Sequence, residues 1–114
     1  MRNFRQYKIW QKAIELTDRV YSYTENFPKS EIYALSCQLQ RAAVSIASNI
    51  AEDSSRTSEK DFAQFLEMFI GSAFEVETQL TIAQRRCYIS EDVSLSEIEE
   101  IQYLEKQINI FIQS

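Results

Sequence analysis

Residues 30–52 read SEIYALSCQLQRAAVSIASNIAE, without a single Gly or Pro. Apolar residues recur along this stretch at intervals of three and four, a spacing that places them on one face of a helix. The apolar stripe consists of Ile32, Leu35, Leu39, Ala42, Ile46 and Ile50. We therefore predict a helix over about residues 31–52, with this face buried.

Helical patterns of the same kind cover about residues 4–26, 58–86 and 95–113. The whole chain of 114 residues contains Gly 1 and Pro 1, whereas sandwiches, barrels and doubly wound folds need many turns rich in these residues. The links between the helical patterns are short, which favours antiparallel neighbours. The sequence therefore predicts one domain over residues 1–114, an all-α, antiparallel up-and-down four-helix bundle.

Local signals mark where the helices begin and end. Pro28 ends the first helix, because the residue before a proline avoids the helical region. Ser58 and Asp61 resemble a capping box, and Ser94 with Glu97 forms a complete one, so we expect the last helix to begin at about residue 95. The residues that we expect to face inward from it are Ile98, Ile101, Leu104, Ile108 and Phe111.

Two of the predicted helices carry more apolar surface than one bundle needs. A second stripe of Trp10, Ile14 and Tyr21 widens the apolar arc of the first helix to about twice the 100° that a core-facing helix requires. Ile70 and Phe74 lie outside the core stripe of the third helix in the same way. Large exposed apolar patches mark interfaces, so we predict that these five residues form contacts between identical subunits. The alternative is that neighbouring helices of the same bundle cover them.

Small and polar residues within the helices suggest close packing. Gly71 lies in mid-helix, where glycine costs about 1 kcal/mol relative to alanine, and a second helix close by, in the bundle or in another subunit, would explain it. Asn49 lies at the edge of an apolar stripe, where a buried amide fixes helix register. We expect Arg41, Asn49 and Glu52 to form an internal polar network. The polar side of the second helix is expected to be a solvated face or a seam between subunits rather than a ligand site. It consists of Gln38, Arg41, Ser45, Ser48 and Glu52.

The residue types exclude most catalytic chemistry. The chain contains no histidine, so it lacks the usual base of nucleophilic catalysis and the commonest metal ligand. A single glycine cannot build a phosphate-cradling loop. We therefore expect no enzyme activity, catalytic residue, metal, cofactor or small-molecule substrate.

The charge is acidic overall and uneven along the chain. Lys+Arg 12 against Asp+Glu 17 gives a net charge of −5, which argues against indiscriminate binding to nucleic acid. Residues 1–12 nevertheless hold Arg2, Arg5, Lys8 and Lys12 and no acid. This patch is either a solvated end or a contact for nucleic acid, and the first alternative is favoured.

The cysteines and the hydropathy suggest in which cellular compartment the protein lies. Cys37 and Cys87 lie singly in apolar helical patterns and are expected to be small buried side chains in a reducing compartment. Neither a leader sequence nor an apolar run of about 18 residues is present, so we expect a cytoplasmic protein. The wide apolar arc of the first helix also permits a helix on a membrane surface, although such an arc is more often buried in protein.

Short segments spread over nearly the whole chain resemble those of a known family. They are WQKA at 10–13, FP at 27–28, LSCQLQRAAVSI at 35–46, NIAE at 49–52, GS at 71–72 and EVETQL at 75–80. Together they resemble a bacterial family, the four-helix-bundle proteins encoded by intervening sequences of 23S rRNA genes.

This resemblance implies a ring-like homopentamer without enzymatic activity. Relatives include the accessory variability protein of diversity-generating retroelements, a basic pentamer that binds a reverse transcriptase and nucleic acid. Gln40 and Ile70 stand where members commonly carry a basic residue, which weakens the case for nucleic-acid binding. The expected function is a non-enzymatic, homo-oligomeric binding or scaffold protein. The alternative is a nucleic-acid-associated accessory protein that uses the basic N-terminal patch around the ring, with RNA or a reverse-transcriptase-like protein as partner.

Overall fold

The computed structural model describes residues 3–53, 55 and 58–113, with side chains as far as Ile108. Its elements are the 3-10 turn η1 (Phe4–Gln6), helix α1 (Lys8–Thr24), the 3-10 turn η2 (Lys29–Glu31), and helices α2 (Leu35–Asp53), α3 (Glu59–Arg85) and α4 (Glu91–Gln113). The described part of the chain contains no strand. The prediction of an all-α fold of four helices is confirmed.

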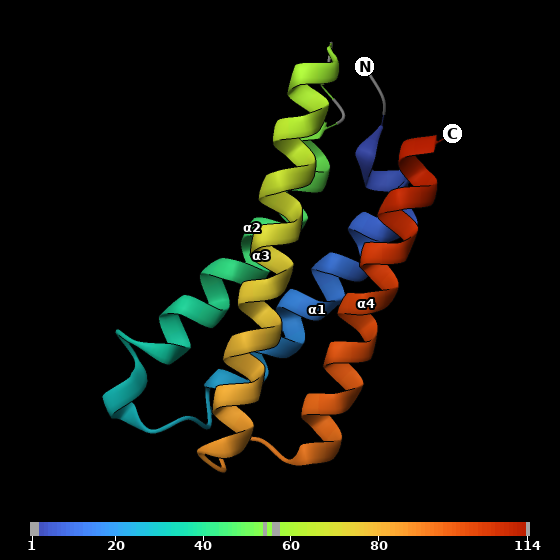
Figure 1. Cartoon of the computed structure of the whole chain (residues 1–114). Helices are drawn as coiled ribbons and strands as arrows, with labels where there is room; N and C mark the ends of the chain where they lie inside the picture. The colour runs from blue at the N-terminus through green and yellow to red at the C-terminus, as the bar shows by residue number, and fades with distance from the viewer. Residues whose placement is uncertain (1–2, 54, 56–57, 114) are drawn as a thin grey trace.

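The helices pack in chain order. Each one contacts the helix that follows it, and α1 also contacts α4. Figure 1 shows α3 and α4 standing side by side, with α1 and α2 running obliquely behind them. The molecule measures 43 × 25 × 22 Å, and its long axis follows the helices. Because every helix has two neighbours, the surface between α1 and α2 lies on the opposite side of the bundle from the surface between α3 and α4.

The core is built from the predicted stripes of all four helices. The largest fully buried side chains are Leu16, Val20, Leu39, Ile46, Ile50, Phe69, Val76, Leu80, Ile101, Leu104 and Ile108. These positions follow the spacing of three and four that a buried helix face requires. Phe111, which was predicted to face inward, lies outside the described side chains.

The second helix begins later than predicted. α2 starts at Leu35, whose backbone N–H donates a hydrogen bond of 3.4 Å to the carboxylate of Glu31, the last residue of η2. Ile32 is consequently 51% exposed, so its predicted place in the core is wrong. The same carboxylate accepts a hydrogen bond of 2.9 Å from the Tyr88 hydroxyl, and the Tyr88 ring packs on Phe27 with the ring centroids 5.2 Å apart. The links α1–α2 and α3–α4 are thereby fastened to each other.

The fourth helix begins earlier than predicted. α4 starts at Glu91, and its cap is Ser90, whose Oγ accepts a hydrogen bond of 3.1 Å from the Val93 backbone N–H. The predicted capping box is therefore wrong. Ser94 is buried inside the helix, and Glu97, 3% exposed, is turned toward α1. At the start of α3 the prediction is confirmed, since Ser58 Oγ accepts a hydrogen bond from the Asp61 backbone N–H at 3.1 Å.

Cys87 ends α3 in a left-handed conformation. The Tyr88 N–H donates to the Ala83 carbonyl at 2.8 Å and the Cys87 N–H to the Gln84 carbonyl at 2.9 Å, the pair of bonds that defines a Schellman motif. Cys87 has φ 65° and is exposed, whereas Cys37 is half-buried. The predicted burial of both cysteines is therefore wrong, because Cys87 occupies a helix end and Cys37 lies at the edge of the core-facing side of α2.

We expect Cys87→Gly to stabilise the protein. A non-glycine residue in the left-handed region costs about 1–2 kcal/mol, and the larger entropy of an unfolded glycine cancels about half of the gain. The net gain of about 1 kcal/mol raises the melting temperature by roughly 4–8 °C. The control is Arg86→Gly, at a position with φ −80°, which should lower the melting temperature. A melting temperature of Cys87→Gly at or below that of the wild type would contradict this account of the helix end.

Gly71 has no close neighbour within the subunit. A Cβ atom built on Gly71 would meet no atom within 4 Å, and the residue is exposed. The expectation that another helix of the bundle approaches here is therefore wrong. An approach by a helix of a second subunit stays a prediction.

Candidate interaction surfaces

Exposed apolar residues form one surface along α1 and α2. The Thr17 hydroxyl lies 3.2 Å from the carbonyl oxygen of Ala43, so this side of α1 faces α2. Ile14 and Tyr21 lie on the same side, turned further outward, and are 37% and 45% exposed. Val44, next to Ala43 on α2, is 40% exposed. We call Ile14, Tyr21 and Val44 the α1–α2 face. Val44 was not predicted to belong to it, because it lies outside the single apolar stripe of its helix.

Trp10 belongs to the same side of α1 but is partly covered. It is half-buried against the core, and its ring meets the ring of Phe4 edge-on with centroids 5.4 Å apart. The 3-10 turn η1 therefore shields part of an indole that the sequence alone placed in the subunit interface.

A second apolar surface lies on α3 at the side of α4. Ile70, Phe74 and Glu77 follow the i, i+4, i+7 spacing of one helix face, and the carboxyl group of Glu77 meets that of Glu105 on α4. Phe74 is 56% exposed, while Ile70 packs partly against the core. We call Ile70 and Phe74 the α3–α4 face. It lies on the opposite side of the bundle from the α1–α2 face.

The carboxyl pair beneath this face is unusual in its protonation. Glu105 Oε1 is buried without a hydrogen-bond partner among the described residues. Burial, followed by the hydrogen bond and the negative charge of Glu77, raises the pKa of Glu105 to about 7. The folded protein therefore retains a proton on Glu105 at pH values where the unfolded chain has lost it.

We expect this pair to make stability fall as the pH rises. A raised pKa in the folded state favours folding at low pH, and that contribution is lost as the pH rises from about 4.5 to about 7. Glu105→Gln should therefore match the wild type at pH 4 and exceed it at pH 8, by about 1 kcal/mol once solvent screening of this partly exposed group is allowed for. Urea unfolding at both pH values measures this. The exposed Glu91→Gln serves as control, and an equal gain at both pH values would contradict the assignment.

An ion pair between the half-buried Arg19 and the buried Glu97 joins α1 to α4. Glu97 Oε2 accepts hydrogen bonds from Arg19 Nε and from the Tyr23 hydroxyl, each at 2.7 Å. The hydrogen bond with Glu97 raises the pKa of Arg19, and burial together with Glu97 raises the pKa of Tyr23 to about 12, so both groups remain donors. This cluster could not be predicted, since the spacing of Glu97 fits a helix cap and Glu97 lies 78 residues after Arg19.

The basic N-terminal residues do not form one free patch. Lys12 is 3.6 Å from the Glu100 carboxylate and lies 5.2 Å from the centroid of the Tyr103 ring. Arg5 is exposed and stacks over the Phe4 ring at 4.5 Å, and Lys8 is exposed. Arg2 lies outside the described residues.

Hydrogen-bonded polar side chains connect α2 to α3. Asn49, 4% exposed, donates from Nδ2 to Ser45 Oγ at 3.3 Å, and Ser45 Oγ lies 2.8 Å from Ser72 Oγ. Arg41 and Glu52, predicted to share a network with Asn49, are both exposed. The structure thus brings Asn49 together with two serines, while the two charged side chains point to solvent.

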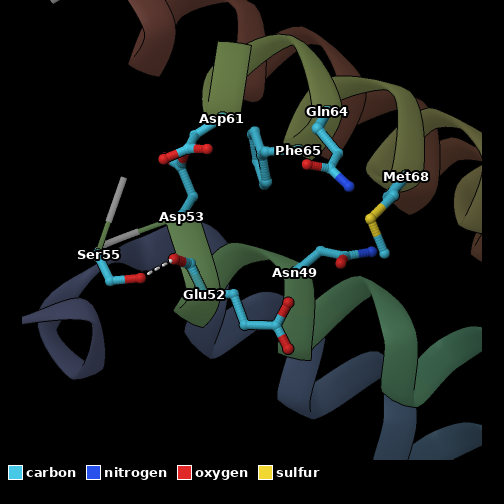
Figure 2. Close-up of a pocket in the computed structure, with 8 residues that line it drawn as sticks. All are labelled: Asn49, Glu52, Asp53, Ser55, Asp61, Gln64, Phe65 and Met68. Atoms are coloured by element: carbon cyan, nitrogen blue, oxygen red, sulfur yellow. Dashed lines mark hydrogen bonds between the residues drawn. The ribbon is translucent and has the colours of Figure 1, made fainter. Parts of the chain in front are cut away.

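Three adjoining hollows lie between α2 and α3. The first, of about 340 Å³, is shown in Figure 2, where Gln64 and Met68 of α3 extend toward Asn49 of α2. It shares Gln64 and Met68 with a second hollow of about 460 Å³. The second shares Ser45, Ser72 and Glu75 with a third of about 510 Å³. Together they form one polar groove, which we call the α2–α3 groove.

Among the described residues, no three Cys, Asp or Glu side chains lie close enough together to hold a metal ion. None of the helices in that part of the chain has both the length and the hydropathy that crossing a bilayer requires.

Comparison with known proteins places the chain among relatives of unestablished function. A family model described as 23S rRNA-intervening sequence protein matches residues 5–110. The crystal structure of a protein with unknown function from the S23 ribosomal protein family of Bacteroides thetaiotaomicron VPI-5482 has 25% sequence identity and a TM-score of 0.78. It matches over 93% of this chain and 99% of that chain. No curated protein matches the sequence.

Proposed function

We propose that this chain, which belongs to the family of 23S rRNA-intervening sequence proteins, is a non-enzymatic scaffold that assembles as a ring of identical subunits. The observation that supports this most is the pair of apolar faces on opposite sides of the bundle. Tyr21 represents the α1–α2 face and Phe74 the α3–α4 face, at 45% and 56% exposure.

Opposite faces favour a head-to-tail contact. When one face of a subunit packs on the other face of the next, the interface is heterologous, and it closes into a ring if the rotation between subunits permits. A two-fold dimer would need only one self-complementary face and would leave the other uncovered. Five subunits is the number that the family resemblance implies.

The side-chain chemistry fits a scaffold better than an enzyme. The Glu97 carboxylate accepts hydrogen bonds from Arg19 and Tyr23 of its own subunit, and the sequence contains no histidine. We also place the protein in the cytoplasm, because an exposed thiol such as Cys87 stays reduced there.

Mixing two interface variants tests the head-to-tail arrangement. Tyr21→Glu disables the α1–α2 face and Phe74→Glu the α3–α4 face, so each variant alone should be monomeric. A mixture joins the one intact pair of faces and should give a dimer of two 13.4 kDa chains, which sedimentation velocity resolves from a monomer. A mixture of folded variants that stays monomeric would contradict complementary faces.

The second candidate is the accessory protein that binds nucleic acid. Its support is the exposure of Arg5 and Lys8, which a ring would repeat on every subunit and so strengthen. Lys12 contributes less, because its ammonium group is engaged with Glu100. Binding of a structured RNA should then weaken steeply between low and moderate salt. Arg5→Ala with Lys8→Ala should abolish it, and RNA binding that survives this double variant would rule the patch out.

A further inference from the structure

Two carboxyl groups meet where α3 and α4 border the α3–α4 face. Glu77 of α3 and Glu105 of α4 are each only partly exposed, and a hydrogen bond joins their side chains. An ionised carboxylate accepts hydrogen bonds but has no proton to donate, so this hydrogen bond requires that one of the two groups is protonated. The Glu77–Glu105 pair is therefore hydrogen-bonded only while it holds one proton.

No cation of the described residues neutralises this pair. From α3, the charged group that faces Glu105 is Glu77, and Glu105 Oε1 is buried without a hydrogen-bond partner. The charged and titratable side chains by which α1 meets α4 are bonded to other carboxylates, Lys12 to Glu100 and both Arg19 and Tyr23 to Glu97. When its proton is lost, the Glu77–Glu105 pair therefore carries two adjoining negative charges without compensation.

The pair lies one helical turn from Phe74, the more exposed residue of the α3–α4 face. Phe74 is 56% exposed, and Glu77 follows it by three residues, the spacing of neighbours on one side of a helix. Another subunit that packs on Phe74 therefore also removes water from the Glu77 carboxyl group. Loss of water favours the neutral form of a carboxyl group, so covering this face and holding the proton strengthen each other.

We propose that the Glu77–Glu105 pair makes the association of the subunits depend on pH. This inference rests on the proposed ring and adds its regulation. With one proton on the pair, the next subunit covers the α3–α4 face; without it, two negative charges must lose water together, which is costly. Burial and Glu77 raise the pKa of Glu105 to about 7 in the separate subunit, and assembly raises that pKa further. Association is therefore strongest below about pH 7 and weakens as the pH rises above it.

A single contact of the ring can be measured in the mixture of the Tyr21→Glu and Phe74→Glu chains. Their dimer uses the α3–α4 face of the Tyr21→Glu chain, whose carboxyl pair is intact. Sedimentation velocity at graded concentrations gives the dissociation constant of this contact at pH 6 and at pH 8.5. We expect the constant to rise by about ten-fold between these values, the effect of raising one pKa by about one unit on association. Circular dichroism verifies that both chains stay folded at both pH values.

The same mixture supplies a matched control. Glu105→Gln in the Tyr21→Glu chain alters the pair inside the contact, and the glutamine amide donates to Glu77 at every pH. The dimer should then associate equally well at pH 6 and pH 8.5. Glu105→Gln in the Phe74→Glu chain alters the pair that lies outside the contact, so the ten-fold dependence should persist. A dependence that survives the first substitution, or that disappears with the second, would overturn the role of this pair.

The outcomes separate this inference from the assembly on which it rests. A mixture that stays monomeric at both pH values would overturn the complementary faces, and the proposed regulation with them. A dimer with the same dissociation constant at pH 6 and pH 8.5 would support the complementary faces and overturn only the role of the carboxyl pair. A dimer that is tighter at pH 8.5 than at pH 6 would contradict the direction of the effect.

Discussion

Phe74→Glu should convert the proposed ring into folded monomers. Phe74 is 56% exposed in the isolated subunit, so glutamate is tolerated there, but in an interface the carboxylate would be stripped of water without a partner. That cost is several kcal/mol, enough to shift an association equilibrium by several hundred-fold or more. Because a head-to-tail ring uses the α3–α4 face in every contact, one substitution breaks all of them.

The matched control for Phe74→Glu lies on the same helix. Ile82 is 44% exposed and points away from the α4 side, so Ile82→Glu should leave the mass unchanged. Ile70→Glu is a poorer choice, because Ile70 also packs against the core and its loss would destabilise the subunit. Circular dichroism verifies that both variants are folded. An unchanged sedimentation profile for Phe74→Glu would exclude this face from the interface.

Glu97→Ala should cause a large loss of stability. Removing the carboxylate takes away two hydrogen bonds of 2.7 Å and leaves Arg19 and Tyr23 partly buried without their acceptor. Breaking a buried pair by deleting one partner costs about 3–5 kcal/mol. The side chain of Arg19 is 39% exposed and can regain water, so we expect about 2–3 kcal/mol, or a drop in melting temperature of roughly 10 °C or more.

The neighbouring ion pair gives the comparison for Glu97. Glu100 lies 3.6 Å from Lys12, and its side chain is 27% exposed, against 3% for that of Glu97. Pairs of this kind contribute about 0–1 kcal/mol, so Glu100→Ala should change the melting temperature by no more than a few degrees. Thermal unfolding followed by circular dichroism measures both. Equal effects of the two substitutions would contradict the special position of Glu97.

Features that depend on local spacing could be predicted from the sequence. The apolar stripes indicate four helices and most of the core. A helix that buries one face carries apolar residues at the helical period, whichever helix it packs against. The cap at Ser58 is likewise local, since it involves only the next three residues. Pro28 indicates the end of α1 for the same reason.

Features that depend on distant residues were predicted wrongly or missed. At the start of α2, the Glu31 carboxylate accepts hydrogen bonds from the Leu35 N–H and from the hydroxyl of Tyr88, 57 residues later. Glu97 fits a capping motif by its spacing, but Arg19 and Tyr23 on α1 draw it into the bundle. Cys87 matches an apolar pattern, but the pattern does not reveal that the chain reverses there.

The candidate surfaces were predictable in part for the same reasons. The exposure of Ile14, Tyr21 and Phe74 follows from an apolar arc wider than the core can cover. The partial burial of Trp10 arises from η1, a tertiary contact without periodicity. For the α2–α3 groove, the sequence indicated the polar side of α2, whereas the facing side chains of α3 are identified only when the two helices are placed together.

Sedimentation equilibrium of the pure wild-type protein at several concentrations tests the central claim most directly. The claim is that identical subunits join through the α1–α2 and α3–α4 faces into a closed ring. We predict one species whose mass does not change with concentration, near five times 13.4 kDa. A mass of 13.4 kDa at every concentration would contradict the assembly, and with it the scaffold function that rests on it.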